Sequence, residues 1–369
     1  MPRKHRFRLT MPKKSLVQRN RNAGAPSDAE WERMEVIAAF QVDDEQKFKK
    51  GDFAILLPDM ADPDNPPRLH EFWVGILRDI RARHIHGEND VWVRVQWFYS
   101  PDDVKSLIKS FDASTCGRYE RVLSDDFTIV SLTCFSDVIS VKEYVESNID
   151  QEDIYACERD QDTGFFYRYD LEHRARTINP KHIGTCLCSI PYNPDKDIMH
   201  LCPHPSCRRW YHRTCLVIRG SIESKVTKRE REDSLLSSSP DSDEPFPVAA
   251  YQHPVPMPSP KKGRGPGTGR GKGKSIVHVS PLATLPEDLL ETARLPIVKG
   301  AKVGGLVGNV RGVVAARRIV YAALEGREPV PKGWREKVID GCKAIREEAA
   351  YGWEDEAPPL KCPQCQGAI

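Results

Sequence analysis

The sequence predicts a multi-domain protein, in which a β-dominated domain precedes a small cysteine-rich module that a long insertion interrupts. Runs of β-branched and aromatic residues fill the first half of the chain, and most of the cysteines gather in two late clusters. A length of 369 residues allows two or three domains. Only 39% of the residues are hydrophobic and 29 are Pro, so part of the chain is expected to be linker.

Membrane and secreted proteins are the classes that the sequence argues against. No apolar run approaches the roughly 18 residues that cross a bilayer, and the basic N-terminus lacks the apolar core of a secretory signal. Eleven cysteines at mostly short spacings indicate intracellular metal binding better than a disulfide framework. We therefore expect no membrane partner.

Charge is strongly segregated along the chain. Residues 1–22 carry eight Lys and Arg and residues 261–274 carry six, both without an acid, whereas residues 31–180 have a net charge of about −12. An acidic body suits a basic peptide partner, and basic tails suit nonspecific contact with DNA. Solvated charge plus a nuclear import signal explains the tails equally well. We expect residues 1–28 to be a disordered basic tail.

The β-dominated domain is expected over residues 35–175 as a barrel-like core with short helices. Pro101 followed by two acids predicts a helix over 101–110, and residues 141–147 are a second helix candidate. Strands are expected over 52–57, 71–80, 91–99, 120–124 and 127–132.

Three aromatic residues stand out on two of these expected strands. Residues two apart share a face of a strand, so the core face of the 91–99 run ends in Trp97 and Tyr99. Trp73 points away from the apolar face of its own strand, beside the small Gly75. From periodicity alone, a half-buried surface Trp or an extension of the core explains Trp73 better than an aromatic cage does.

The second half alternates polar and helical segments. Residues 216–283 are rich in Ser, Pro and charge and are expected to be a disordered linker. Residues 284–355 are expected to be a helical insertion, which Thr284 and Glu287 open with a capping box. Helices are expected over 305–324 and 334–349, and the second has an apolar face formed by Trp334, Val338, Ile339, Cys342 and Ile345.

The cysteine clusters provide metal ligands at characteristic spacings. Thiolate and imidazole donors this close together suit zinc, and eight of them fill two tetrahedral sites. Protein ligands would then occupy every position and leave no place for a catalytic water. No nucleophile elbow, P-loop or dinucleotide-binding motif occurs either, so we expect no enzyme. In chain order the ligands are Cys186, Cys188, Cys202, Cys207, His212, Cys215, Cys362 and Cys365.

The last pair lies far from the rest, because 146 residues separate Cys215 from Cys362. Closing that loop in place of one of about 20 residues costs roughly 1.8 kcal/mol. A structural zinc contributes on the order of 10–16 kcal/mol, which outweighs the cost. The alternative is that Cys362 and Cys365 form a separate knuckle and that His200 or His204 completes the second site.

Two stretches resemble a known family. KKGDFAILLP, WVRVQWFYSPDDV, ERVLSDDFTIVSL, VISVKEY and EDIYACERD resemble a bromo-adjacent homology (BAH) domain. The cysteine segment that follows, with Trp210 and Tyr211 before His212, resembles a PHD finger made of residues 183–215 and 358–369. Together they resemble the BAH–PHD chromatin readers, which include the plant early-bolting and short-life proteins and the fungal effector of polycomb repression.

This resemblance implies an interleaved ligand set and two histone-binding sites. One zinc would be held by Cys186, Cys188, His212 and Cys215, and the other by Cys202, Cys207, Cys362 and Cys365. The BAH domain would read H3K27me3 through a cage of Trp73, Trp97 and Tyr99. The PHD finger would contact the H3 N-terminus or methylated H3K4 through Tyr192, Met199 and Trp210, although Trp210 could also be a packing residue.

The resemblance further implies a nuclear chromatin reader that binds the H3 tail or the nucleosome and supports transcriptional repression, with corepressors as possible partners. Family members from plants carry a His where this chain has Asp126, which puts any peptide contact there in doubt. Two alternatives stay open. One is a RING-like ubiquitin ligase, and the other is a nucleosome or protein scaffold that ignores methylation.

Overall fold

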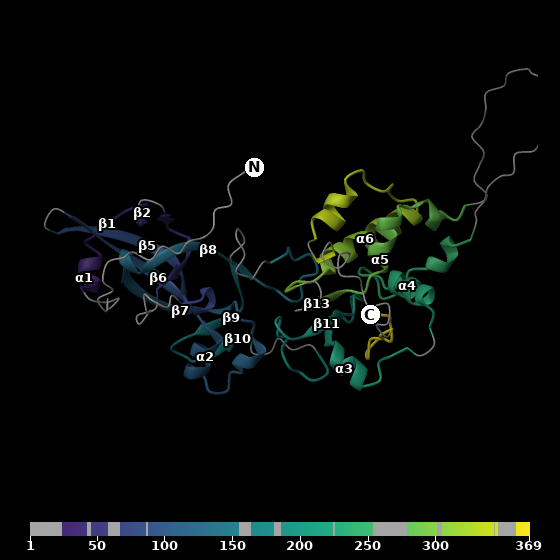
Figure 1. Cartoon of the computed structure of the whole chain (residues 1–369), viewed down its shortest axis with the longest axis horizontal. Helices are drawn as coiled ribbons and strands as arrows, with labels where there is room; N and C mark the ends of the chain where they lie inside the picture. The colour runs from purple at the N-terminus through teal and green to yellow at the C-terminus, as the bar shows by residue number, and fades with distance from the viewer. Residues whose placement is uncertain are drawn as a thin grey trace, which may run out of the picture. The chain divides into compact units, whose positions relative to one another are not determined.

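The structure is a computed structural model, and its described part divides into two compact units. The first unit consists of residues up to Glu146 with Ile154–Gly184 and Ile190–Asp195, and the second takes the remaining residues up to Ile369. Figure 1 labels the elements of both. The structure describes residues 24–42, 46–57, 67–85, 88–154, 164–180, 186–223, 226–253, 279–300, 305–342, 344–345 and 359–369.

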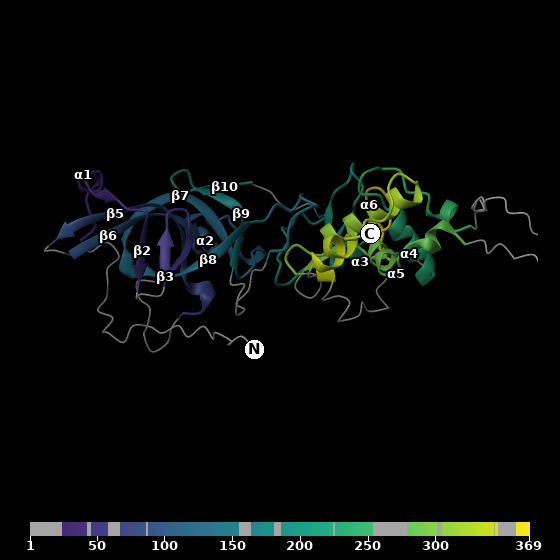
Figure 2. The same cartoon turned by 90° about the horizontal axis from the view of Figure 1, so that it is seen from above.

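The first unit is a β-barrel, which agrees with the expected β-dominated architecture. Its strands pair in the order β5-β4-β8-β9-β7-β6, and β6 pairs again with β5, so the sheet closes on itself. Figure 2 shows these strands curving round into a wall. β1 and β10 extend the sheet, and β2 and β3 form a separate hairpin. The barrel strands are β4 (Phe53–Leu56), β5 (Trp73–Ile85), β6 (Glu88–Tyr99), β7 (Glu120–Ser131), β8 (Phe135–Glu143) and β9 (Gly164–Glu172). The others are β1 (Glu35–Val36), β2 (Ala39–Val42), β3 (Gln46–Lys49) and β10 (Thr177–Asn179).

Both faces of the barrel wall bury apolar side chains. Along β4, Ala54 and Leu56 belong to one core cluster while Ile55 belongs to another, because alternate residues of a strand point to opposite faces. The continuous apolar run of this strand therefore reflects burial on two sides. Gly75 of β5 is held where an added Cβ would lie 2.2 Å from Val95 Cγ1, so the barrel requires a glycine there.

Short helices complete the first unit. They are α1 (Asp28–Trp31), α2 (Pro101–Leu107) and the 3₁₀ turns η1 (Leu69–Glu71), η2 (Ala113–Thr115) and η3 (Leu132–Cys134). The helix expected over 101–110 is present as α2, and Ser100 and Asp103 form its capping box. The helix expected over 141–147 is wrong, because residues up to Glu143 belong to β8, whose end from Ser140 to Glu143 pairs with β9. The run 120–124 and residues 127–131 of the run 127–132 belong to one strand, β7, whose register shifts opposite β6.

A buried ionic group ties β7 to β9. The Arg168 guanidinium donates to both carboxylate oxygens of Glu120, at 2.9 and 2.8 Å, and to Glu146 at 2.7 Å. The side chain of Glu120 is fully buried, and the backbone N–H of Gly117 also donates to it. Burial alone would lower the pKa of Arg168, but the two carboxylates raise it, so the guanidinium stays charged.

We expect Glu120→Gln to lower the free energy of unfolding by about 3–5 kcal/mol, because it removes the main countercharge of a buried guanidinium. The Gln side chain keeps the shape of the Glu and can still accept from Gly117. Glu146→Gln is the matched control and should cost less, since Glu146 is the more exposed carboxylate. Equal losses in chemical denaturation would contradict this ranking.

The second unit combines a small sheet with helices. Strand β11 lies between β12 and β13 in a three-stranded antiparallel sheet. A hydrophobic core joins α4, α5, α6 and η6, with Leu236, Leu289, Val320 and Val338 fully buried. The strands are β11 (Ile198–Leu201), β12 (Trp210–His212) and β13 (Val298–Gly300). The helices are α3 (Arg213–Ile218), α4 (Lys228–Ser237), η4 (Val248–Tyr251), η5 (Pro281–Thr284), α5 (Glu287–Arg294), α6 (Val310–Leu324) and the π-helical η6 (Glu336–Asp340).

The insertion leaves and re-enters the cysteine-rich part through one narrow stem. Ile222 and Leu360 form an antiparallel bridge. Glu223 N donates to Pro359 O, and Lys361 N donates to Ser221 O, each at 2.9 Å. The Lys361 ammonium also lies 2.8 Å from the Glu223 carboxylate. The two ends of the insertion are therefore hydrogen-bonded neighbours.

The expectation of a disordered linker over 216–283 needs correction. Thr227 caps α4 with Glu230, and Leu236 and Phe246 join the core of the helical insertion, which explains why this polar stretch is ordered. Residues 254–278, which include the basic Gly-rich run, lie outside the described residues, as do residues 1–23 of the expected basic tail.

The helical part of the insertion follows the expected pattern only in part. The predicted capping box at Thr284 does not form, because the Thr284 hydroxyl donates to Pro281 O and α5 begins after Pro286 without a side-chain cap. Within the expected 305–324 helix, α6 begins only at Val310. The helix expected over 334–349 is present only in part, because the π-helical η6 ends at Asp340 and residues 343 and 346–349 lie outside the described residues. Most of its expected apolar face is buried, with residues Trp334, Val338, Cys342 and Ile345.

Candidate metal centres and aromatic residues

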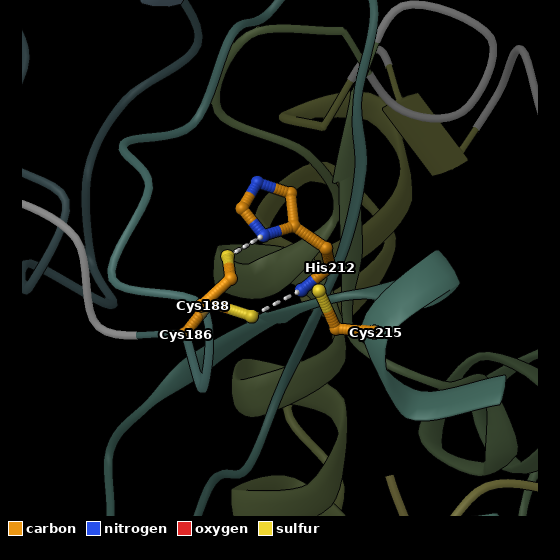
Figure 3. A group of neighbouring side chains, drawn as sticks. All are labelled: Cys186, Cys188, His212 and Cys215. Carbon is orange, nitrogen blue, oxygen red and sulfur yellow. Dashed lines mark hydrogen bonds between the residues drawn. The ribbon is translucent and has the colours of Figure 1, made fainter. Parts of the chain in front are cut away.

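The first cysteine cluster brings its four donors together at the start of α3. Cys186, Cys188, His212 and Cys215 have donor atoms that all lie within 4.8 Å of one another. Figure 3 shows Cys188 facing the His212 ring, with Cys186 and Cys215 completing the group. The Cys188 Sγ lies 3.4 Å from His212 Nδ1, and the His212 backbone N lies 3.3 Å from Cys186 Sγ. These separations fit four ligands around one small ion.

An acidic residue fixes the orientation of the imidazole in this cluster. The Asp197 carboxylate lies 3.4 Å from His212 Nε2, on the far side of the ring from the cysteines. A carboxylate at that position holds the Nε2–H and directs Nδ1 toward the metal position, as in carboxylate–histidine–zinc groups. Burial opposes ionisation of Cys186, but hydrogen bonds from His212 and from the backbone bring the pKa of its thiol down to about 6.

We expect Asp197→Asn to weaken metal binding at the first cluster about 10- to 100-fold, because it removes the charge that orients and polarises His212. Competition with a chromophoric chelator on the full chain measures this affinity. Asp243→Asn is a suitable control, since Asp243 accepts from the backbone of Ser206 away from the first cluster. An unchanged affinity for Asp197→Asn would show that the carboxylate has no part in holding the metal.

The second cluster joins residues from the two ends of the insertion. Cys202, Cys207, Cys362 and Cys365 also have sulfur atoms within 4.8 Å of one another. Cys202 and Cys365 are 3.4 Å apart and Cys207 and Cys362 are 3.6 Å apart, measured between Sγ atoms. The Tyr211 hydroxyl lies 3.6 Å from the sulfurs of both Cys207 and Cys362.

The chemistry of this donor set fits a divalent cation. A hydrogen bond from Cys202 lowers the pKa of the Cys362 thiol to about 4, and the same interaction, with burial, raises that of Cys202. Without a metal, one thiolate therefore suppresses ionisation of its neighbour. A zinc ion would supply the charge that allows all four to be thiolates. The two clusters could thus bind two zinc ions, in the interleaved pairing that the resemblance implied. The alternative ligands His200 and His204 belong to neither cluster.

The aromatic residues of the barrel lie at one end of the β5–β6 pair. Gly75 pairs directly with Trp97, so Trp73, Trp97 and Tyr99 all project from the same face of this pair. The Trp73 and Trp97 rings are 5.5 Å apart and inclined at 76°. Trp97 is only 4% exposed and packs in the core, whereas Trp73 is 36% exposed. The two indoles therefore form a right-angled corner, and Trp73 is its solvent-facing wall.

Tyr99 is anchored by residues that the sequence patterns left unassigned. Its hydroxyl donates to Asp126 at 2.9 Å, and its ring lies 5.6 Å from that of His173. Burial and the bond to Asp126 raise the pKa of Tyr99, so the phenol keeps its proton. Asp126 lies where the register of β7 shifts opposite Trp97. Asp126, which stands where family members from plants carry a His, thus places a carboxylate beside Tyr99.

The residues expected to contact the histone at the finger are buried. Tyr192 belongs to the first unit, where the Arg168 guanidinium lies 6.0 Å from its ring centroid. Met199 and Trp210 belong to β11 and β12 of the second unit. The Lys299 ammonium lies 4.2 Å from the Trp210 ring centroid. A role of these three residues in histone binding stays a prediction, as does the cage.

Comparison with solved structures shows a likeness to a BAH domain. The sequence matches no protein-family model and no curated protein. Among solved structures, the yeast Rsc2 BAH domain is similar with a TM-score of 0.27 and 14% sequence identity, over 39% of this chain and 53% of that one. The chain thus spans about half the length of that structure. Within the described residues, no helix is long and apolar enough to cross a membrane.

Proposed function

We propose that this chain is a nuclear histone-tail reader without catalytic activity, whose barrel binds a trimethyl-lysine of histone H3 and whose zinc-binding module is structural. H3K27me3 is the mark that the sequence resemblance favours, and support of transcriptional repression is the expected outcome. DNA contact by the basic tails and recruitment of corepressors would add to this function.

The corner of Trp73 and Trp97 is the observation that supports this proposal best. A trimethylammonium group has no N–H to donate, so aromatic faces recognise it through cation–π attraction, worth roughly 0.5–2 kcal/mol. Trp73 offers such a face to solvent, the buried Trp97 indole stands at 76° behind it, and Asp126 adds negative charge beside Tyr99. The net charge of about −12 over residues 31–180 favours a basic peptide in general.

Calorimetry of the zinc-loaded full chain tests the proposal with H3 peptides that span lysine 27 and differ only in methylation. We expect the trimethylated peptide to bind roughly 3- to 30-fold more tightly than the unmodified one, the ratio that this interaction energy supports. Equal affinities would overturn the proposal. Polyubiquitin chains formed with a ubiquitin-conjugating enzyme would favour the ligase alternative.

A second candidate function, nucleosome docking that ignores methylation, is favoured by a basic groove on the barrel. Arg78 and Arg94 are exposed there, and the Arg94 guanidinium lies 5.5 Å from the ring centroid of the exposed Phe127. The groove's one acid, Asp79, is already paired with Arg81 at 2.9 Å. The groove has a volume of about 760 Å³ and is lined by Val36, Lys50, Arg78, Asp79, Arg81, Arg94, Gln96 and Phe127.

If this groove contacts phosphates, Arg78→Ala with Arg94→Ala should reduce the slope of log affinity against log salt for nucleosomal DNA by about two. Arg174→Ala with Arg176→Ala is the matched control, because both of these arginines are exposed on the same unit outside the groove. Fluorescence anisotropy over a salt series measures the slope. Equal slopes for the two double variants would exclude the groove as the contact.

A further inference from the structure

The sheet of the second unit contains a strand from the insertion. β13 pairs antiparallel with β11, with Lys299 opposite Met199 and Val298 opposite His200. Leu201 N also donates to Ile297 O at 2.9 Å. On its other side β11 pairs with β12, where Leu201 is opposite Trp210. The insertion therefore supplies an extended segment that covers one edge of β11.

The side chain of Lys299 reaches an aromatic ring across this sheet. Directly opposite residues share a face, so Lys299, Met199, Leu201 and Trp210 all lie on one side. The Lys299 ammonium lies 4.2 Å from the Trp210 ring centroid, within the range of a cation–π contact. Lys299 is fully buried and Trp210 is only 4% exposed, so the contact is largely closed to solvent.

The backbone around the segment is shaped to hold it. The buried Asn309 side chain accepts from Val298 N at 2.8 Å and donates to Pro296 O at 3.0 Å. Gly300 has a φ of 144°, and an added Cβ there would lie 2.1 Å from Asp197 O. An amide clamp and an obligatory glycine fix the segment in one register.

Strand addition to a sheet edge, with a side chain received in its own site, is a general mode of peptide recognition. We infer that the chain's own segment 297–300 is a built-in ligand of the β11 edge, with Lys299 on the indole face of Trp210, and that it closes this edge to any other extended, lysine-bearing peptide. A peptide from another protein reaches this site only by displacing that segment. The inference rests on the second unit alone and is independent of methyl-lysine binding by the barrel.

Lysine labelling of the zinc-loaded full chain tests the occupancy without any substitution. With a limiting acetylating reagent and mass spectrometry, we expect Lys299 to react at least tenfold more slowly than the exposed Lys105. Reaction of both lysines at one rate would overturn the inference. A peptide of the first twelve H3 residues, unmodified or trimethylated at lysine 4, should bind wild type and Trp210→Ala equally. Binding that depends on Trp210 while Lys299 stays protected would also overturn it.

A released variant tests the peptide specificity. Lys299→Ala with Asn309→Ala removes the lysine and its clamp, and a synthetic peptide of residues 295–303 then serves as the probe. We expect this probe to bind the double variant at least tenfold more tightly than it binds wild type. A second probe with Ala in place of the central Lys should bind both proteins with equal affinity. Equal binding of both probes to a variant that retains two zinc ions would exclude Trp210 as a lysine site. If the variant loses zinc, the lysine labelling of the wild-type chain decides whether segment 297–300 occupies the edge of β11.

Discussion

Serine in place of Cys362 is expected to reduce the zinc content of the chain from two ions to one. The Cys362 sulfur is fully buried between Cys207 and the Tyr211 hydroxyl, and three remaining thiols cannot complete a tetrahedral structural site. A structural zinc contributes on the order of 10–16 kcal/mol, so the second cluster should lose its folded geometry. Metal analysis of the purified chain gives the stoichiometry.

Cys342→Ser provides the control for this experiment. Cys342 is buried in the same unit but belongs to neither cluster, so this variant should keep two ions whatever it costs in stability. Two ions retained by Cys362→Ser would mean that the distal pair forms a separate knuckle. His204 would then be the first replacement ligand to test, because its Nε2 is next to Gly367, close to Cys365.

Trp73→Ala is expected to abolish the preference for trimethylated over unmodified H3 peptide while lowering the free energy of unfolding by less than Trp97→Ala does. Trp73 is a solvent-facing wall, so its removal takes away a ring face without opening a core cavity. Trp97→Ala is a poorer probe, because a buried Trp replaced by Ala costs about 3–5 kcal/mol. The variant thus separates recognition from stability.

Phe127→Ala is the matched control for Trp73→Ala. Phe127 is an exposed aromatic residue of the same unit that lines the basic groove and not the aromatic corner. It should leave methyl discrimination unchanged in the same calorimetric titration. If Trp73→Ala still discriminates, the cage assignment fails, even if the barrel binds histone peptides by another surface.

Patterns that depend on local periodicity and ligand spacing were predictable from the sequence. Alternating apolar runs identified the strands that carry Trp73 and Trp97, and Pro101 with its acids identified α2. The cysteine spacing identified all eight members of the two clusters. These signals are strong because the period of a strand and the geometry of a metal site are encoded in neighbouring residues.

Features that depend on distant partners were not predictable. Residues 141–143 carry a helix-like pattern, yet they belong to β8, because hydrogen bonds to β9 outweigh a weak local preference. α4 lies in a polar run whose order depends on Leu236 meeting the core of the insertion. Lys299 gave no signal at all, since one Lys between Val and Gly acquires meaning only when β13 meets β11. Asp126 and His173 become part of the aromatic site in the same way.

The hydrogen-bonded stem at Ile222 and Leu360 separates the size of the insertion from the geometry of the metal ligands. Because the two ends of the insertion are already adjacent, Cys362 and Cys365 reach Cys202 and Cys207 however many residues the insertion contains. Adding residues to the insertion far from this stem therefore changes the entropy of closing the loop only slowly. A shortened protein that joins residue 223 to residue 359 by a tight turn would keep the distal ligands in register, but it would give up the strand that covers β11.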